Sequence, residues 1–218
     1  MVRAGFDQEL QKLEDSVVEM AELAKSSVDA AVESLKKKDI KLAEKAIDIE
    51  EELDKRSLDI ENACMRLTAL QQPVAKDLRF IASMLKISDV LERIGDYAAK
   101  IAKITIRTKD KPLVKPLIDI PKMAELSKEM IDIDIKAIRT KNVSGLEKKL
   151  TERDDVIDSL YEQIYRELLT MMFERPQIIS DATDLIFVGR NLERIGDLAC
   201  KVANRTIYMV EGRRALIK

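Results

Sequence analysis

The chain has 218 residues, 46% of them hydrophobic, and a net charge of −2, so no overall field attracts nucleic acid or an anionic membrane. It contains no histidine, which removes the commonest general base and the usual zinc ligand. Any bound metal must therefore be a hard ion held by carboxylates, carbonyls and water. No uncharged run approaches the ~18 residues of a membrane span, and the N-terminus shows no signal peptide, so we expect a cytoplasmic protein without membrane insertion.

The first half of the chain predicts three helices. Apolar residues recur at helical spacing over residues 6–35 and indicate the first helix. Asp39 is the expected N-cap of a second helix that runs to about Leu70. Pro73 then ends that pattern and opens a third helix, which continues to Arg107. Cys64 lies on an apolar helical face and is expected in the core, as is Cys200 later in the chain.

A short segment after the third helix is typical of a linker. Residues 109–121 contain Pro112, Pro116 and Pro121, which exclude a helix and indicate a semi-extended connection. The helical pattern restarts at about Lys122 and continues to residue 139. The segment therefore separates two helical halves.

The second half repeats the organisation of the first. Asn142 or Ser144 is expected to cap a fifth helix that runs to about Met172. Pro176 ends it as Pro73 ended the second, and a sixth helix continues to about Glu211.

One hexapeptide, LERIGD, occurs in both halves. It spans residues 91–96 and 192–197, which are 101 residues apart, while Pro73 and Pro176 are 103 apart. The chain is therefore predicted to be all-α, a tandem repeat of two similar antiparallel three-helix bundles with six long helices. The repeats are placed at residues 1–108 and 122–218, on either side of the 109–121 linker.

Each hexapeptide carries a pair of carboxylates and a glycine. Glu92 and Asp96 are four residues apart and share one helical face, as do Glu193 and Asp197. On a wheel of ~100° per residue each pair lies opposite the apolar stripe and is expected to face outward. A mid-helix glycine costs about 1 kcal/mol relative to alanine, so its recurrence indicates close approach by a neighbouring helix or a ligand.

Two interpretations of these pairs remain open. The pairs can belong to a solvated surface, where Asp96 with Lys100 and Asp197 with Lys201 form ordinary ion pairs along the helix. Alternatively they form a metal platform, completed by carboxylates of the preceding helix. Those further candidates are Glu51, Asp54, Asp155 and Asp158.

Longer stretches of both halves resemble the PhoU family of phosphate-transport regulators. The resemblance lies in LQQPVAKDLRFIASMLKISDVLERIGDYAAKIA and in DLIFVGRNLERIGDLACKVANRTIYM, and it extends over nearly the whole chain. It implies two three-helix bundles, no catalytic activity, and a cytoplasmic regulator that restrains phosphate uptake. The implied partners are subunits of a phosphate ABC transporter, a sensor histidine kinase in many bacteria, and a second copy in a homodimer.

The resemblance also implies metal sites. Family members bind iron or other metal clusters through E(D)-x-x-x-D motifs on the bundle surface, which Glu92, Asp96, Glu193 and Asp197 match in this chain. Asp89 extends the first acidic face by one turn, and Asn204 lies near the second. No organic cofactor is expected. The chain has no glycine-rich phosphate loop, so direct phosphate sensing through such a motif is not supported.

Two other functions were weighed. A di-metal carboxylate oxidase of ferritin-like type would need buried Glu-x-x-His motifs, which a chain without histidine cannot supply. A helical adaptor without metal or phosphate role would use the repeat for packing alone.

Overall fold

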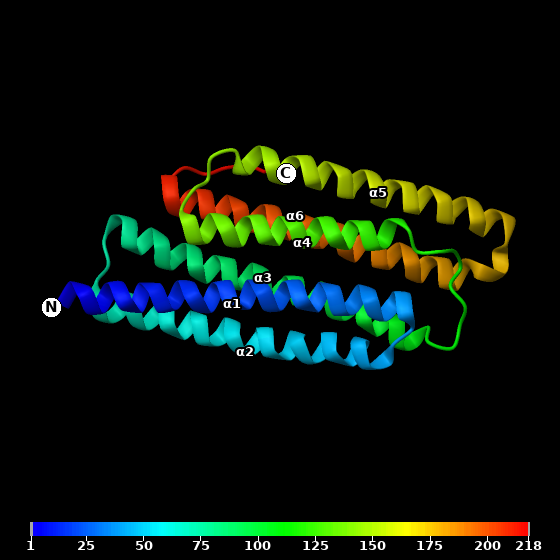
Figure 1. Cartoon of the computed structure of the whole chain (residues 1–218), viewed down its shortest axis with the longest axis horizontal. Coiled ribbons are helices and arrows are strands. Elements are labelled where there is room, and N and C mark those ends of the chain that lie inside the picture. The colour runs from blue at the N-terminus through cyan, green and yellow to red at the C-terminus, as the bar shows by residue number, and fades with distance from the viewer. Residues whose placement is uncertain (1, 218) are drawn as a thin grey trace.

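The computed structural model of the chain describes residues 2–217, with side chains from Gly5 onward. The described chain is helical and contains no strand, which confirms the all-α prediction (Figure 1). In chain order the elements are α1 (Val2–Lys37), α2 (Ile40–Gln71), α3 (Ala75–Arg107), α4 (Asp119–Thr140), α5 (Leu146–Glu174), the 3-10 turn η1 (Pro176–Ile178) and α6 (Ile179–Glu211).

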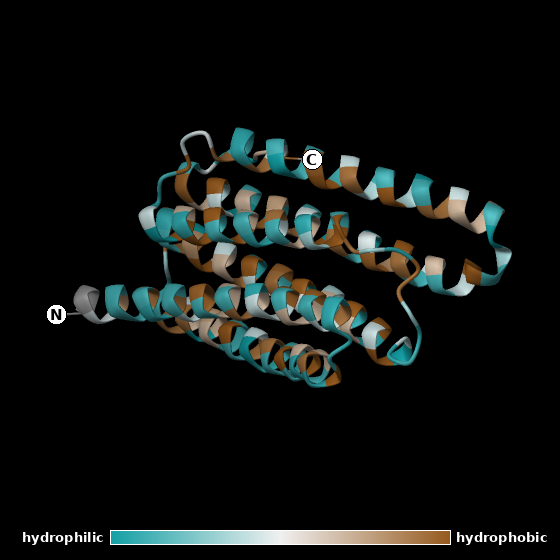
Figure 2. Ribbon diagram, turned by 45° about the vertical axis from the view of Figure 1, so that its right-hand side comes forward, coloured by the Kyte–Doolittle hydropathy of each residue, from teal (hydrophilic) through white to brown (hydrophobic). Residues whose placement is uncertain are grey.

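The helices form two three-helix groups that lie side by side. Helices α1, α2 and α3 pack together, as do α4, α5 and α6, and the apolar faces point into the bundles (Figure 2). The two groups meet where α3 packs against α6 and α1 against α4, whereas α2 and α5 lie at the outside (Figure 1). The helices that carry the hexapeptide are therefore the central pair.

Ion pairs fix the register of α1 against α4. Lys25 Nζ lies 2.6 Å from Asp132 Oδ1, and Lys128 Nζ lies 2.6 Å from Asp29 Oδ1. In these two pairs each helix gives one cation and one anion to its neighbour, and Arg139 of α4 also pairs with Glu14 and Asp15 of α1. Such exposed pairs are worth at most about 1 kcal/mol each, so the apolar core supplies most of the stability.

A helix cap and the two cysteines lie where the sequence predicts them. Asp39 caps α2 as predicted, since its Oδ1 accepts hydrogen bonds from the Lys41 and Leu42 amides at 2.9 and 3.3 Å. Cys64 and Cys200 are both free thiols buried in the core, as expected. Burial raises the pKa of Cys64 to about 12, so that thiol stays protonated.

Three helix starts differ from the predicted ones. Helix α3 begins at Ala75 rather than Pro73, because Val74 takes an extended N-cap conformation. Helix α4 begins at Asp119, so Pro121 lies inside its first turn, where the missing N–H has no intrahelical partner to lose.

The predicted cap of α5 is also wrong. Helix α5 begins at Leu146, after Gly145 in a left-handed conformation with φ 67°. Asn142 Oδ1 instead accepts the Ser144 amide at 3.0 Å within the preceding turn. A short Asx turn therefore delivers the chain to the glycine that starts the helix.

No helix in the described residues is long and apolar enough to cross a membrane.

Candidate functional site

The acidic pairs on α3 and α6 face a neighbouring helix rather than open solvent. Glu92 and Asp96 are half-buried, and the side chains of Glu193 and Asp197 are only 13% and 25% exposed. The prediction of an outward face is wrong to this extent. The physical reason is that each central helix is covered by three others, so little of its surface is left open.

In the first half, carboxylates of α2 join those of α3. Burial raises the pKa of Glu92, and the charges of Asp96 and Asp54 raise it further. Burial also raises the pKa of Glu50, which feels the same two aspartates, while Lys103 opposes the shift. We call Glu50, Asp54, Glu92 and Asp96 the first acidic cluster.

The second half has an equivalent cluster between α5 and α6. Asp154 is 4% exposed, and burial raises its pKa to about 7, with Asp158 and Asp197 adding to the shift. Burial and Asp197 raise the pKa of Glu193, although Arg190 and Arg194 lower it. We call Asp154, Asp158, Glu193 and Asp197 the second acidic cluster.

Two members, Glu50 and Asp154, were missed by the sequence reasoning. The sequence indicates Glu51 and Asp155 instead, three residues before Asp54 and Asp158. All four of these side chains are exposed, whereas Glu50 is half-buried and Asp154 is buried. A signal was present, because Glu50 and Asp154 stand four residues before those aspartates, the same spacing as in LERIGD. Side chains four apart lie one turn above each other, so this spacing indicates a shared face.

Two other candidates lie elsewhere. Asp89 Oδ2 is paired with Lys86 Nζ at 3.1 Å. Asn204 holds the C-terminal segment, since its Oδ1 accepts the Ile217 amide at 3.0 Å and its Nδ2 donates to the Ile217 carbonyl at 3.2 Å. The structure thus gives both residues partners outside the acidic clusters.

The duplicated glycines allow α2 and α5 to approach. A Cβ added at Gly95 would overlap Cδ1 of Leu53, which is fully buried. A Cβ added at Gly196 would lie 3.2 Å from both Asp154 Oδ1 and Ile157 Cδ1. The expected close approach is thus made by a neighbouring helix, and in the second half a carboxylate takes part in it.

The lysines expected to neutralise the pairs do not do so. Lys100 Nζ lies over the Tyr97 ring, 4.4 Å from its centroid, rather than beside Asp96. Among the described residues Lys201 has no ion pair with Asp197 or any other carboxylate. The solvated-surface interpretation is wrong in its ion pairs.

Arginines take that role, but only in the second half. Arg190 Nη1 lies 2.6 Å from Glu193 Oε1, and Arg194 Nη1 lies 2.7 Å from Asp197 Oδ2. Over the described part of the chain, no basic side chain forms an ion pair with Glu92 or Asp96. The first cluster is therefore the less neutralised of the two.

The chemistry of both clusters fits a hard cation. All donors are carboxylate oxygens. In the second cluster, Asp154 Oδ1 and Glu193 Oε2 are buried without a hydrogen-bond partner among the described residues, although Arg194 Nε lies 3.7 Å from Glu193 Oε2. Within residues 2–217, however, no three acidic or cysteine side chains already converge on one point. Binding a cation would thus require these side chains to rotate toward one another.

The fold and paired motifs define the class, an all-α protein made from a duplicated three-helix domain. The PhoU domain model matches residues 17–105 and 120–206, once for each half. The chain therefore belongs to the PhoU family. The matches fall on the two predicted repeats, while the division at residues 108 and 122 stays a prediction.

Relatives and solved structures agree over almost the full length. The chain is 40% identical to a phosphate-specific transport system accessory protein PhoU homolog of Aquifex aeolicus, covering 94% of this chain and 92% of that one. The homolog of Clostridium acetobutylicum is 35% identical, covering 98% of each. The crystal structure of PhoU from Pseudomonas aeruginosa superposes with a TM-score of 0.90 at 31% identity, over 95% of this chain and all of that chain.

A second solved structure supports the same fold. The phosphate transport system regulatory protein PhoU from Streptococcus pneumoniae superposes with a TM-score of 0.88 at 28% identity, covering 97% of this chain and 99% of that chain.

Proposed function

We propose that this protein is a non-enzymatic cytoplasmic regulator of phosphate uptake that acts on a phosphate ABC transporter. The observation that carries the proposal is the match of both halves, over nearly the full length, to proteins named accessory or regulatory components of a phosphate transport system. The partners we propose are transporter subunits, a sensor histidine kinase where the host has one, and a second copy in a homodimer.

The acidic clusters give this function a physical means of control. Burial is the main cause that raises the pKa values of Glu50 and Glu92, and repulsion from Asp54 and Asp96 adds to it. A bound cation relieves that repulsion and joins α2 to α3. We propose iron or another hard metal ion for this role, held by the first cluster and, less tightly, by the second.

A cell-based experiment tests the regulatory role. The gene is deleted, and phosphate uptake is measured in phosphate-replete medium with and without the wild-type copy. Deletion should raise uptake, and a pull-down should recover transporter subunits with the protein. Unchanged uptake together with no recovered transporter subunit would contradict the proposal.

The role of metal is tested in the same strain. Complementation with Glu92→Gln plus Asp96→Asn should restore less control than the wild type, because the variant loses two anionic ligands. Full control by this variant would instead favour a helical adaptor that needs no metal. That alternative has one observation in its support, namely that no three ligands converge within the described residues.

A further inference from the structure

A depression in the surface lies between α3, α6 and the C-terminal segment 212–217, apart from the acidic clusters. We call it the basic hollow. Its volume is about 510 Å³. Its walls carry five cationic side chains and one carboxylate. The cations are Lys86, Arg93, Lys201, Arg205 and Arg214, and the carboxylate is Asp89. A strongly positive hollow is unexpected on a chain whose net charge is −2.

Most of these cations have no protein partner. Lys86 pairs with Asp89 at 3.1 Å. In the part of the chain that the structure describes, no carboxylate forms an ion pair with any of the other four. All five cations are exposed, so solvent screens their mutual repulsion, but together they attract an anion into the hollow.

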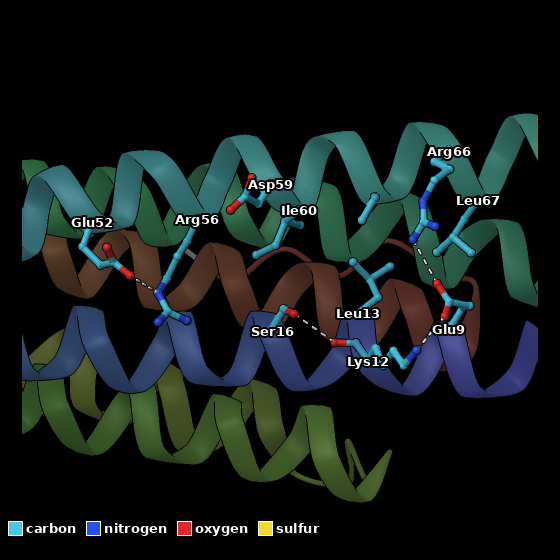
Figure 3. A pocket seen from close by; sticks show the side chains of 11 residues that line it. Glu9, Lys12, Leu13, Ser16, Glu52, Arg56, Asp59, Ile60, Arg66 and Leu67 are labelled. Atoms are coloured by element: carbon cyan, nitrogen blue, oxygen red, sulfur yellow. Dashed lines mark hydrogen bonds and ion pairs between the residues drawn. The ribbon is translucent and has the colours of Figure 1, made fainter.

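The depression between α1 and α2 shows the opposite pattern. Its volume is about 440 Å³, close to that of the basic hollow. Its cations are paired, Lys12 with Glu9 at 2.8 Å, Arg66 with Glu9 at 3.0 Å and Arg56 with Glu52 at 2.8 Å (Figure 3). A hollow of this size thus does not by itself leave cations unpaired.

The C-terminal segment is folded back to complete the basic hollow. Helix α6 ends at Glu211, and its C-cap residue Gly212 has φ 74°. The chain then reverses direction (Figure 1). The two hydrogen bonds between Asn204 and the Ile217 backbone hold this segment, and Ala215 and Ile217 are each 7% exposed. This anchoring places Arg214 on the wall of the hollow.

The two copies of the hexapeptide differ at this point. Arg93 of the first copy faces the hollow without an ion pair in the described residues. Its counterpart Arg194 is bound to Asp197 at 2.7 Å. The equivalent arginine has therefore been left available on one side of the molecule only.

We propose that this hollow binds a multiply charged phosphorylated small molecule of about nucleotide size. Arginine guanidinium groups suit phosphate oxygens because they donate in a planar fork, and three of the four unpaired cations are arginines. The volume lies within the ~300–1,000 Å³ of small-molecule sites, larger than a single phosphate requires. Val90, Tyr208 and Leu216 supply an apolar wall beside the cations.

Calorimetric titration of the full chain tests the proposal with three probes: ATP without magnesium, inorganic tripolyphosphate and inorganic phosphate. Saturable one-to-one binding is expected for the first two, with inorganic phosphate at least tenfold weaker. If ATP binds more tightly than tripolyphosphate, the apolar wall contacts the nucleotide base. If the two affinities are equal, the ligand is an inorganic chain of phosphates. Both results support a multiply charged ligand.

Variants locate the binding. Arg93→Gln with Arg205→Gln should weaken ATP or tripolyphosphate binding at least tenfold, and Arg214→Gln alone should weaken it severalfold. The matched control is Lys45→Gln with Lys136→Gln, two exposed lysines on α2 and α4 outside the hollow, and its affinity should stay within twofold. Circular dichroism at each step confirms that the variants remain folded.

Three outcomes would overturn the proposal. They are no saturable binding of any probe, equal affinity for inorganic phosphate and tripolyphosphate, or equal losses in the hollow variant and the control. Binding of a transporter subunit that is lost in the hollow variant, with no small-molecule binding, would assign the surface to a protein partner instead.

Discussion

The two acidic clusters descend from one repeated unit, yet their surroundings differ. In the first cluster, the apolar Leu53 side chain packs against Gly95. Glu92 and Asp96 have no arginine partner among the described residues. In the second cluster, the Asp154 carboxylate packs against Gly196, and arginines form ion pairs with Glu193 and Asp197. The repeat has thus kept the carboxylates and the glycine while their charge environment has diverged.

The repulsion between neighbouring carboxylates is reduced in different ways in the two clusters. The second cluster is relieved internally, by Arg190, by Arg194 and by a proton on Asp154, whose pKa is about 7. The first cluster has weaker internal relief, and Glu50 and Glu92 keep raised pKa values. We therefore propose the first cluster as the better site for an external cation.

The largest expected effect is on the pH dependence of stability. Because Asp154 has a folded pKa of about 7 against 3.8 unfolded, the folded state binds the proton more tightly. Its contribution is greatest below pH 4 and is lost as pH rises to about 7, on the order of 2–4 kcal/mol. Asp154→Asn mimics the protonated form and should raise the unfolding free energy at pH 8 by about 2 kcal/mol.

Urea unfolding at pH 5 and pH 8 checks this prediction. Glu50→Gln is the matched control in the first half and should give a smaller gain, because Glu50 is less buried than Asp154. Asp134 is a second buried carboxyl whose pKa burial raises, so Asp154→Asn should reduce the pH dependence rather than abolish it. A variant whose stability fell between the two pH values as steeply as the wild type would show that Asp154 is not the titrating group.

Substitution of the two repeated glycines by alanine should change the free energy of unfolding by a smaller amount. Gly95→Ala places a methyl group against buried Leu53, and overpacking of ~1–3 kcal/mol outweighs the ~1 kcal/mol gain in helix propensity. A net loss of about 1 kcal/mol is expected in thermal or urea unfolding. At Gly196 the same change should be within about 0.5 kcal/mol of neutral, since a shift of a few tenths of an ångström suffices. Equal losses at both positions would remove this distinction between the clusters.

Substitution of the arginine in each copy of the hexapeptide should have the smallest effect on stability. Arg194→Ala removes the ion pair with Asp197 and should cost about 0.5–1 kcal/mol at low salt, with less cost at high salt. Arg93→Ala, the same position in the first copy, should cost less than that. Thermal unfolding at two salt concentrations measures both variants, and a larger cost for Arg93→Ala would reverse the comparison.

The helical spacing of apolar residues and the sequence repeat predict the six helices and their division into two groups of three. Helix starts were less predictable where backbone conformation decides, as at Val74 and Gly145. The carboxylates of LERIGD are predicted from their spacing, their exact repetition and the family resemblance. Glu50 and Asp154 are not predicted, because several acidic residues precede each of Asp54 and Asp158. Only packing shows which of them turns toward the neighbouring helix.

The basic hollow could not be predicted from sequence at all. Its cations come from residues 86–93, 201–205 and 214, and only the contact between α3 and α6 brings them together. Asn204 illustrates the same limit, since its hydrogen bonds to Ile217 depend on the reversal of the chain after Gly212.

The inequality of the two clusters is tested most directly by metal content per chain, measured on protein purified without chelator or affinity tag. Wild-type protein is compared with Glu92→Gln plus Asp96→Asn and with Glu193→Gln plus Asp197→Asn. We expect the wild type to retain iron or another hard cation, the first variant to lose most of it, and the second to lose much less. Equal losses from the two variants, or a wild type without metal, would contradict the account.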